Sequence, residues 1–289
     1  MKSDNLYNRF KKIELLTKRY VNNAFVGKYI SKFKGLGIEF DDIKEYEYGD
    51  DTKFIDWNVT ARYRKPFIKK YTEERELNIY IVIDVSSSTF FGTKNLKSTL
   101  INEIASIISF CAIKNNDKVA LVLFSDIINK FIPLNKGNKH FQRILREILK
   151  ASNSDSKSTN FNVVAEFLKK VQKKKSIMFV ISDLLTNDMP YKKLSSLQFN
   201  HEIILIKIID KLEKNISNMG TVKLIDSENN QAIWINSKNK LMQSAINKSL
   251  ESYSTHQKEI LTKNKIDYLE LNTYSNYIHT LVRFLKYRK

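Results

Sequence analysis

The chain has 289 residues, of which 42% are hydrophobic and 28% are charged, enough for one large globular domain or for one domain with an appendage. Cys111 is the only cysteine, which excludes an intrachain disulfide and favours a reducing compartment. The amino terminus lacks the apolar core of a signal peptide, and no stretch approaches the roughly 18 apolar residues that span a bilayer. We therefore expect a cytoplasmic protein without a transmembrane segment.

The formal net charge of +18 raises the question of a nucleic acid or an anionic membrane as the ligand. The charge is uneven, because residues 1–35 carry nine Lys or Arg and two acids, whereas residues 38–56 carry eight acids and two Lys. Lys, Asn and Ile are plentiful along the whole chain, so a composition bias of the source genome explains part of the excess. No helix-turn-helix, zinc-finger or ribonucleoprotein signature accompanies the charge. Nucleic-acid binding stays an alternative, and nucleic acid is not the partner that we expect.

Two short features open the chain. Residues 5–30 carry apolar side chains three and four positions apart, which predicts one or two amphipathic helices that cover the main domain. Gly35 to Phe40 follow, and this stretch is interpreted as a turn rather than a dinucleotide-binding loop, because the third glycine is missing and no strand precedes it.

Residues 39–76 form the least ordinary segment, since acids, aromatics and arginines lie close together in it. Alternation around Phe67, Lys69 and Tyr71 predicts a strand that leads toward the central one. Buried pairs of arginine and carboxylate could latch the segment onto the domain, or its aromatic and charged groups could form an exposed recognition surface. The residues alone leave both readings open.

From residue 77 onward, short apolar runs alternate with amphipathic stretches. In chain order we predict a strand at 78–84, a helix from about 94 to 111, a hairpin of strands at 119–124 and 127–132, helices at 140–150 and 162–174, strands at 176–182 and 203–209, a hairpin at 222–226 and 231–235, a helix at 241–261, a strand at 268–271 and a helix at 274–287. This alternation predicts an α/β fold: a three-layer, doubly wound, mostly parallel sheet. We place this domain at residues 77–289, after an N-terminal helical and β extension at residues 1–76.

Oxygen-bearing side chains follow the first predicted strand of the domain, at the point where the strand ends. Asp84 closes the apolar run, and Ser86 and Ser88 come at alternate positions after it. In an extended loop the three side chains can turn to one side, outside the carboxyl end of the strand, where open α/β sheets bind ligands. Carboxylate and hydroxyl oxygens suit Mg²⁺ or Mn²⁺ and are wrong for zinc or copper.

A second group of polar residues reinforces this prediction. Asp183 directly follows the predicted strand at 176–182. If this strand is the neighbour of the strand at 78–84, Asp84 and Asp183 lie together at one end of the sheet. Two such carboxylates repel each other unless a cation or a proton lies between them. Thr159 precedes the predicted helix at 162–174, with Ser158 as its substitute, although simple helix capping also explains this loop.

The pattern Asp84-x-Ser86-x-Ser88, with a distal Thr159 and a later Asp183, resembles the metal-ion-dependent adhesion site of von Willebrand factor type A domains. In that family the first Asp, the two Ser, the Thr and the second Asp surround a divalent ion and leave a position open for an acidic side chain of the partner. The resemblance therefore implies a metal site made of these five residues.

Further motifs resemble the bacterial family called domain of unknown function 58, from about residue 20 to the end. They are Gly37-Ile38-Glu39-Phe40, Tyr48-Gly49-Asp50-Asp51, Ile55-Asp56-Trp57, Thr60-Ala61-Arg62 and Glu73-Glu74-Arg75. That family places these motifs directly before a von Willebrand factor type A-like domain. Its members are described beside MoxR-type AAA+ ATPases, which implies an adaptor or chaperone-like role here.

Competing chemistry can be compared with the residues. A haloacid-dehalogenase-like phosphatase needs a second Asp two positions after Asp84, where this chain has Ser86. Neither a Gly-x-Ser-x-Gly elbow nor a Gly-x-x-x-x-Gly-Lys-Ser/Thr loop is present, so we expect neither a serine hydrolase nor an ATPase.

We expect a non-enzymatic, divalent-metal-dependent protein-binding module whose Mg²⁺ or Mn²⁺ receives an acidic residue of a protein partner, for which a MoxR-type AAA+ ATPase is the candidate. The alternatives are a metal-dependent phosphoester hydrolase at the same pocket and a basic nucleic-acid-binding protein.

Overall fold

The computed structural model describes residues 39–72, 76–93, 96–151, 158–171, 174–185, 191–214, 220–225, 232–236 and 238–287. The helices expected within residues 5–30 and the first part of the turn expected at Gly35 lie outside these residues. Glu39 and Phe40, which were assigned to that turn, instead begin a strand. Within the described part of the chain, none of the helices combines the length and the apolar character needed to cross a lipid bilayer.

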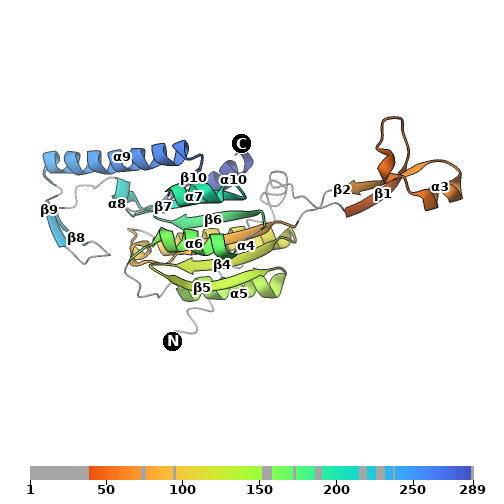
Figure 1. Ribbon diagram of the computed structural model, residues 1–289. Coiled ribbons are helices and arrows are strands. Elements are labelled where there is room, and N and C mark those ends of the chain that lie inside the picture. The colour runs from red at the N-terminus through yellow and green to blue at the C-terminus, as the bar shows by residue number, and fades with distance from the viewer. Residues whose placement is uncertain are drawn as a thin grey trace.

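A six-stranded sheet forms the centre of the molecule (Figure 1), in the order β10-β7-β6-β3-β4-β5. Its strands, in chain order, are β3 (Asn78–Asp84), β4 (Lys118–Phe124), β5 (Ile128–Asn135), β6 (Ser176–Ser182), β7 (His201–Ile209) and β10 (Asp267–Asn272). Every neighbouring pair is parallel except β4 and β5, which form the expected antiparallel hairpin. The chain runs from β3 outward to β5 and then returns to the other side of β3 with β6. The sheet order therefore reverses between β3 and β6, where doubly wound sheets bind their ligands.

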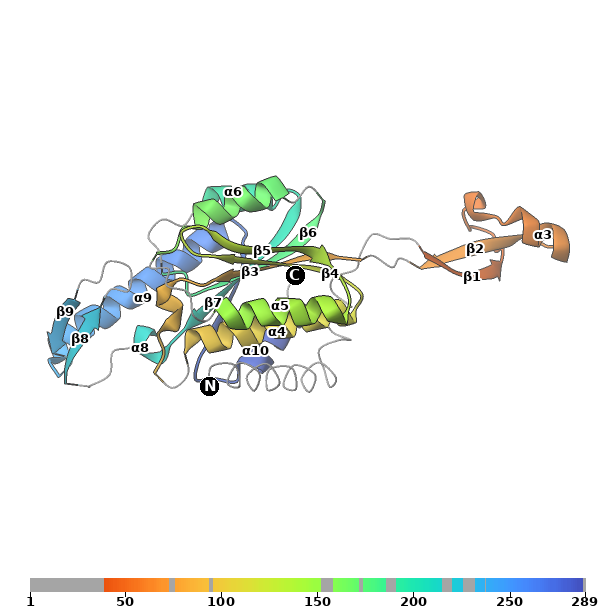
Figure 2. The same ribbon diagram turned by 90° about the horizontal axis from the view of Figure 1, so that it is seen from below.

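Helices cover both faces of the sheet (Figure 2). One face holds α4 (Lys97–Lys114), α5 (Asn138–Ala151) and α10 (Tyr277–Tyr287), and the other holds α6 (Phe161–Val171), α7 (Tyr191–Leu197) and the C-terminal end of α9 (Lys240–Lys263). Alternate residues of β3 feed the two cores. Ile81 packs on the first face and Val82 on the second, both fully buried. The predicted three-layer, doubly wound fold is confirmed.

Residues 39–72 form an arm that projects from the body (Figures 1 and 2). The arm contains the antiparallel strands β1 (Glu39–Glu45) and β2 (Phe67–Thr72), the 3-10 helix η2 (Thr52–Phe54) and the helix α3 (Trp57–Tyr63). The strand expected near Phe67 is therefore present, but it pairs with β1 in a separate two-stranded sheet and does not join the central one.

Among the arm side chains that the structure describes, the ion pairs join residues of the arm to each other, such as Lys69 Nζ to Asp56 at 3.3 Å, while Trp57 and Tyr63 are 71% and 68% exposed. Of the two readings left open for this segment, the exposed surface agrees better with these contacts than the latch does. Glu74 and Arg75 lie outside the described residues. The boundary expected at residue 76 falls between β2 and β3, and the division into two units stays a prediction.

The remaining elements lie near the carboxyl edge of the sheet or beyond it. They are the 3-10 helix η3 (Ser87–Phe90), the short helix α8 (Lys211–Lys214) and the antiparallel hairpin β8 (Thr221–Ile225) and β9 (Ala232–Asn236). The hairpin matches its prediction within one residue, whereas α3, α7 and α8 were not foreseen. Helix α4 begins at Lys97 rather than near residue 94, and this difference matters for the site.

Candidate functional site

Asp84 lies at the carboxyl end of β3 and is 1% exposed. Its Oδ1 accepts a hydrogen bond from the backbone N–H of Ser86 at 2.9 Å, and its Oδ2 accepts one from the Ser182 hydroxyl at 2.7 Å. Burial, and then the charge of Asp183, raise the pKa of the Asp84 carboxyl to about 6. A positive charge placed beside Asp84 would relieve this unfavourable environment.

The two serine hydroxyls after β3 face each other. Ser86 and Ser88 are 1% and 7% exposed, and their Oγ atoms lie 3.1 Å apart. Ser86 is the N-cap residue of η3, and the Thr89 hydroxyl donates to its carbonyl at 2.7 Å, which fixes the loop. Neighbouring ligands of an octahedral Mg²⁺ are separated by about 3.0 Å, since each lies about 2.1 Å from the ion. The spacing of the two hydroxyls is compatible with such a pair of ligands.

Thr159 reaches the same place from the loop before α6. Its hydroxyl donates to Asp84 Oδ2 at 3.5 Å, a long contact. The next residue anchors this loop, because the Asn160 N–H donates to the Ser125 carbonyl, beyond the end of β4, at 2.9 Å. Between Thr159 and its substitute Ser158, the structure therefore brings Thr159 to the carboxylate.

Asp183 follows β6, the parallel neighbour of β3, and is 1% exposed. The parallel pairing of β3 and β6, with Ile83 opposite Ile181, places Asp84 and Asp183 at the same edge of the sheet, as expected, and the charge of Asp183 contributes to the raised pKa of Asp84. Leu184, the residue after Asp183, has a φ of 53°, in the left-handed region that non-glycine residues rarely adopt. Its N–H donates to the Ser182 hydroxyl and its carbonyl accepts from Gln257, both at 2.9 Å, and these contacts hold the turn that presents Asp183.

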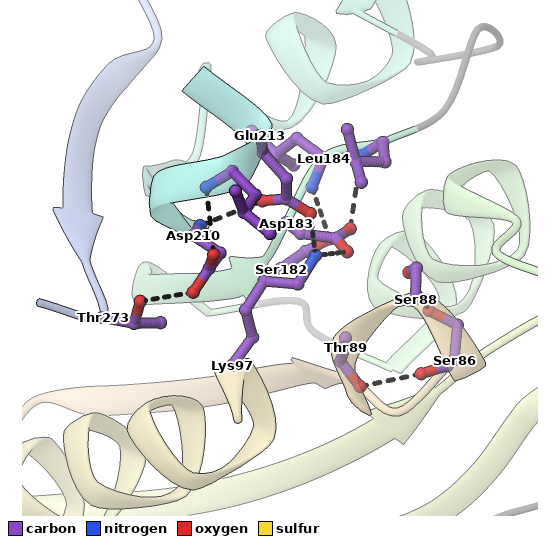
Figure 3. A network of polar contacts seen from close by, with 12 residues as sticks. Ser86, Ser88, Thr89, Lys97, Ser182, Asp183, Leu184, Asp210, Glu213 and Thr273 are labelled. Atoms are coloured by element: carbon purple, nitrogen blue, oxygen red, sulfur yellow. Dashed lines mark hydrogen bonds and ion pairs between the residues drawn. The ribbon is translucent and has the colours of Figure 1, made fainter. Parts of the chain in front are cut away.

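The orientation of Asp183 differs from that of a residue facing an open ion site (Figure 3). Its Oδ2 accepts a hydrogen bond from Lys97 Nζ at 2.7 Å, and the same ammonium lies 2.5 Å from Glu213 Oε1. Lys97 is completely buried. Burial alone would lower the pKa of the Lys97 ammonium, but the charges and hydrogen bonds of Asp183 and Glu213 raise it above its ordinary value, which favours the charged form of the group.

Glu213 is itself fixed by the start of α8. Its Oε2 accepts from the Asp210 N–H at 3.0 Å, while Asp210 Oδ1 accepts from the Leu212 N–H at 3.1 Å. This reciprocal arrangement has the contacts of a capping box. Because Glu213 is held in this way, it holds Lys97 against Asp183.

Asp210 also joins three segments at this edge. It follows β7 directly, its carboxylate accepts from the Thr93 N–H at 3.1 Å in the loop before α4, and it accepts from the Thr273 hydroxyl at 2.8 Å after β10 (Figure 3). These hydrogen bonds lower the pKa of Asp210 even though burial opposes them. The loop that carries the serines is therefore tied to the two strands beyond β6.

The five predicted site residues thus lie at one edge, in two different settings. Asp84, Ser86, Ser88 and Thr159 present carboxylate and hydroxyl oxygens, the hard donors that Mg²⁺ and Mn²⁺ take. Asp183 lies alongside them, but one of its oxygens is engaged by Lys97. Among the described residues there is no group of three or more His, Cys, Asp or Glu side chains with metal-binding geometry. The donor set fits a hard divalent cation on the Asp84 side of the site.

Sequence reasoning missed Lys97, Ser182, Asp210 and Glu213. A signal for Lys97 was present, since it lies three and seven positions before Leu100 and Ile104 and so shares their buried helical stripe. A lysine on such a stripe needs a buried carboxylate partner. The spacing Asp-x-x-Glu directly after a buried strand was a similar signal for Asp210 and Glu213.

The strand order, with one antiparallel strand at the edge, defines a von Willebrand factor type A-like α/β domain. A family model described as "Protein of unknown function DUF58" matches residues 42–257, and the chain belongs to this family.

The protein Rv1480 of Mycobacterium tuberculosis (strain ATCC 25618 / H37Rv), described as uncharacterized, is 26% identical over 218 residues, which cover 75% of this chain and 69% of that protein. Among solved structures, BatB from Bacteroides thetaiotaomicron is similar with a TM-score of 0.45 and 11% identity, over 72% of this chain and 96% of that one. The VWA domain of SpRpn10 is similar with a TM-score of 0.35 and 13% identity, over 72% and 94%.

Proposed function

We propose that the protein is a non-enzymatic protein-binding module that uses a divalent cation, Mg²⁺ or Mn²⁺, at the carboxyl edge of its sheet. The observation that supports this best is the meeting of Asp84 with the hydroxyls of Ser86, Ser88 and Thr159 at the point where the sheet order reverses. These donors come from two loops separated by about 70 positions, and chain connectivity alone does not require them to meet.

The cation would supply an electrophilic position that accepts a carboxylate of the partner. Asp84 contributes one formal negative charge, and the three hydroxyls contribute none. A divalent ion held by such ligands keeps residual positive charge, so its attraction for an external carboxylate is retained. Deep burial of Asp84 supports a role in holding an ion rather than in attacking a substrate.

The partner that we propose is a MoxR-type AAA+ ATPase, for which this protein would act as an adaptor in the cytoplasm. This part of the proposal is supported by family membership and by the motifs of the arm. The exposed Trp57 and Tyr63 of the arm offer a second contact surface apart from the metal edge.

The test is binding of the purified protein to a MoxR-type ATPase from the same organism, in Mg²⁺ and in EDTA. Asp84→Asn keeps the shape of the side chain and removes its charge, and Glu251→Gln makes the matched change at an exposed site of α9. We expect Mg²⁺-dependent binding that Asp84→Asn weakens at least about tenfold, since the loss of even an outer-shell partner of a ligand reduces metal affinity on this scale, and that Glu251→Gln leaves intact. Equal binding in EDTA, or by the Asp84 variant, would refute metal dependence.

A further inference from the structure

The feature that carries a further inference is the ammonium group of Lys97, which occupies one side of the proposed cation site. The side chain is completely buried at the first residue of α4, and the Lys97 N–H donates to the Phe91 carbonyl at 2.9 Å, which fixes where the helix begins. From that position the side chain reaches Asp183, directly after β6, and Glu213 on α8 (Figure 3). A charged group at this depth persists only because both carboxylates compensate for its lost hydration.

The formal charges show what Lys97 changes. Asp84, Asp183 and Glu213 together carry −3, and Lys97 reduces the cluster to −2. The ammonium also takes Asp183 Oδ2, while Asp183 Oδ1 accepts from the Leu185 N–H at 3.2 Å. A divalent ion that approaches this edge therefore meets a carboxylate already bound to a cation and a positive charge that repels it.

Lys97 is not free to move aside. Glu213 holds it from the outer side through the capping contacts of α8, and its ammonium lies 5.7 Å from the centre of the Phe91 ring. For Asp183 to turn toward an incoming ion, an ammonium–carboxylate contact in a buried setting must break, which is costly.

We propose that Lys97 is a resident cation of Asp183 that weakens divalent-ion binding at this edge and confines the ion to the donors Asp84, Ser86, Ser88 and Thr159. This inference rests on the proposed function, because it assumes a metal site there. With Asp183 neutralised by lysine, the bound ion has fewer protein charges around it and so attracts a partner's carboxylate more strongly. Lys97 therefore lowers the affinity of the protein for the divalent ion and raises the affinity of the bound ion for the partner's carboxylate.

The experiment is titration of the full-length protein with Mn²⁺ alone, followed by calorimetry and by electron paramagnetic resonance of the free ion. Lys97→Gln removes the ammonium. The double variant Lys97→Gln/Glu213→Gln removes one charge of each sign, so it frees Asp183 without changing the net charge and without leaving Glu213 unpaired. Lys211→Gln, at an exposed lysine of α8, is the control for the loss of one positive charge.

We expect Lys97→Gln to bind Mn²⁺ at least about tenfold more tightly than the wild type, since a neighbouring unit charge in a partly buried setting has at least this effect. The double variant should also bind Mn²⁺ more tightly than the wild type, because the carboxylate of Asp183 is then free to become a ligand. The Lys211 control should stay within about twofold, as expected of a solvated surface charge. If Lys97→Gln does not fold, the double variant decides the question.

The outcomes separate the two proposals. If the wild type, Lys97→Gln and the double variant bind Mn²⁺ equally well, the role assigned to Lys97 is wrong while the metal site stands. If none of them binds Mn²⁺ at millimolar concentration, the metal site itself is wrong, and the role of Lys97 fails with it. Tighter binding by the Lys211 control to the same extent would show a general charge effect and would also overturn the role of Lys97.

Discussion

Asp117 offers a test of the fold's electrostatics away from the candidate site. It precedes β4 at the amino edge of the sheet, is 4% exposed, and its Oδ1 accepts from the Leu77 N–H at 2.9 Å. Burial raises the pKa of its carboxyl from 3.8 to about 7, the Leu77 hydrogen bond opposes this, and the charge of Glu76 adds to it. A carboxylate at this position is therefore less stable in the folded protein than in the unfolded chain.

The sign of the pH dependence follows from the raised pKa. The stability that protonated Asp117 contributes is complete below its unfolded pKa of 3.8 and is lost as the pH rises through about 7. The full pKa difference corresponds to about 4 kcal/mol at about 1.4 kcal/mol per pH unit. Water reaches the neighbouring Glu76, so we take about half of this, roughly 2 kcal/mol, as the penalty above pH 7.

Asp117→Asn removes the titrating group and keeps an oxygen for the Leu77 N–H. We expect the melting temperature of the variant, relative to the wild type, to increase between pH 4 and pH 8 by about 4–8 °C, since 1 kcal/mol moves it by about 2–4 °C in a domain of this size. Thermal unfolding across that pH range, with Asp126→Asn as the exposed control, measures the effect. The slope is diagnostic, because the new amide N–H₂ group can lower stability equally at every pH. Parallel curves for the Asp117 variant and the wild type would refute the reasoning.

Three further predictions concern the core and the alternative functions. Ile181→Ala, at a fully buried residue of β6, should lower the free energy of unfolding by about 2–5 kcal/mol in a urea titration. Ile127→Ala, at a side chain that is 59% exposed, should change the free energy of unfolding by no more than about 0.5 kcal/mol. Equal losses in the two variants would contradict the assigned burial. Cys111 is completely buried and burial raises the pKa of its thiol, so a thiol reagent should label it only as fast as the domain opens, and labelling at the rate of a free thiol would contradict the packing of α4. Because the protein is proposed to bind a protein partner, we expect no phosphoester turnover that EDTA abolishes and no retention on DNA or RNA at low salt. Phosphoester turnover that EDTA abolishes would favour the hydrolase alternative, and retention on DNA or RNA that falls steeply with increasing salt would favour the nucleic-acid alternative.

The main domain was predictable because its signals are local. Runs such as Ser176–Ser182 are short, apolar and β-branched, which is the pattern of a strand buried on both faces, and the helices between such runs carry wide apolar stripes. The placement of Asp84 and Asp183 at one edge followed from a general rule, since parallel strands end at the same side of their sheet.

The arm was less predictable because its pairing is not local. β1 has the sequence Glu-Phe-Asp-Asp-Ile-Lys-Glu, and acidic residues are depleted in strands. Its register sets Asp42 opposite Lys70 and Ile43 opposite Lys69, so the strand depends on a partner about 25 positions away. A sequence pattern cannot reveal such a partner before the hairpin is known.

The engagement of Asp183 was hidden for a related reason. Its contact with Lys97 joins positions 86 apart, and the contact of Lys97 with Glu213 joins positions 116 apart. The motif of Asp84, Ser86 and Ser88 specifies oxygen donors but says nothing about a neighbouring lysine. The helix predicted from about residue 94 already contained Lys97, but a lysine is ordinarily expected on the solvated face of a helix, so its burial among apolar neighbours was not foreseen.

The hydrogen bonds of Asp210 bear on how this protein can be redesigned. The Asp210 carboxylate accepts a hydrogen bond from the Thr93 N–H, in the loop that carries Ser86 and Ser88, and another from the Thr273 hydroxyl, in the segment after β10. Libraries that randomise the loop to change the proposed partner binding should therefore keep Thr93, and truncations that remove β10 will disturb the candidate site although that strand contributes none of its proposed ligands. Changes to the proposed binding specificity are best sought at Leu185, whose exposed side chain flanks this edge.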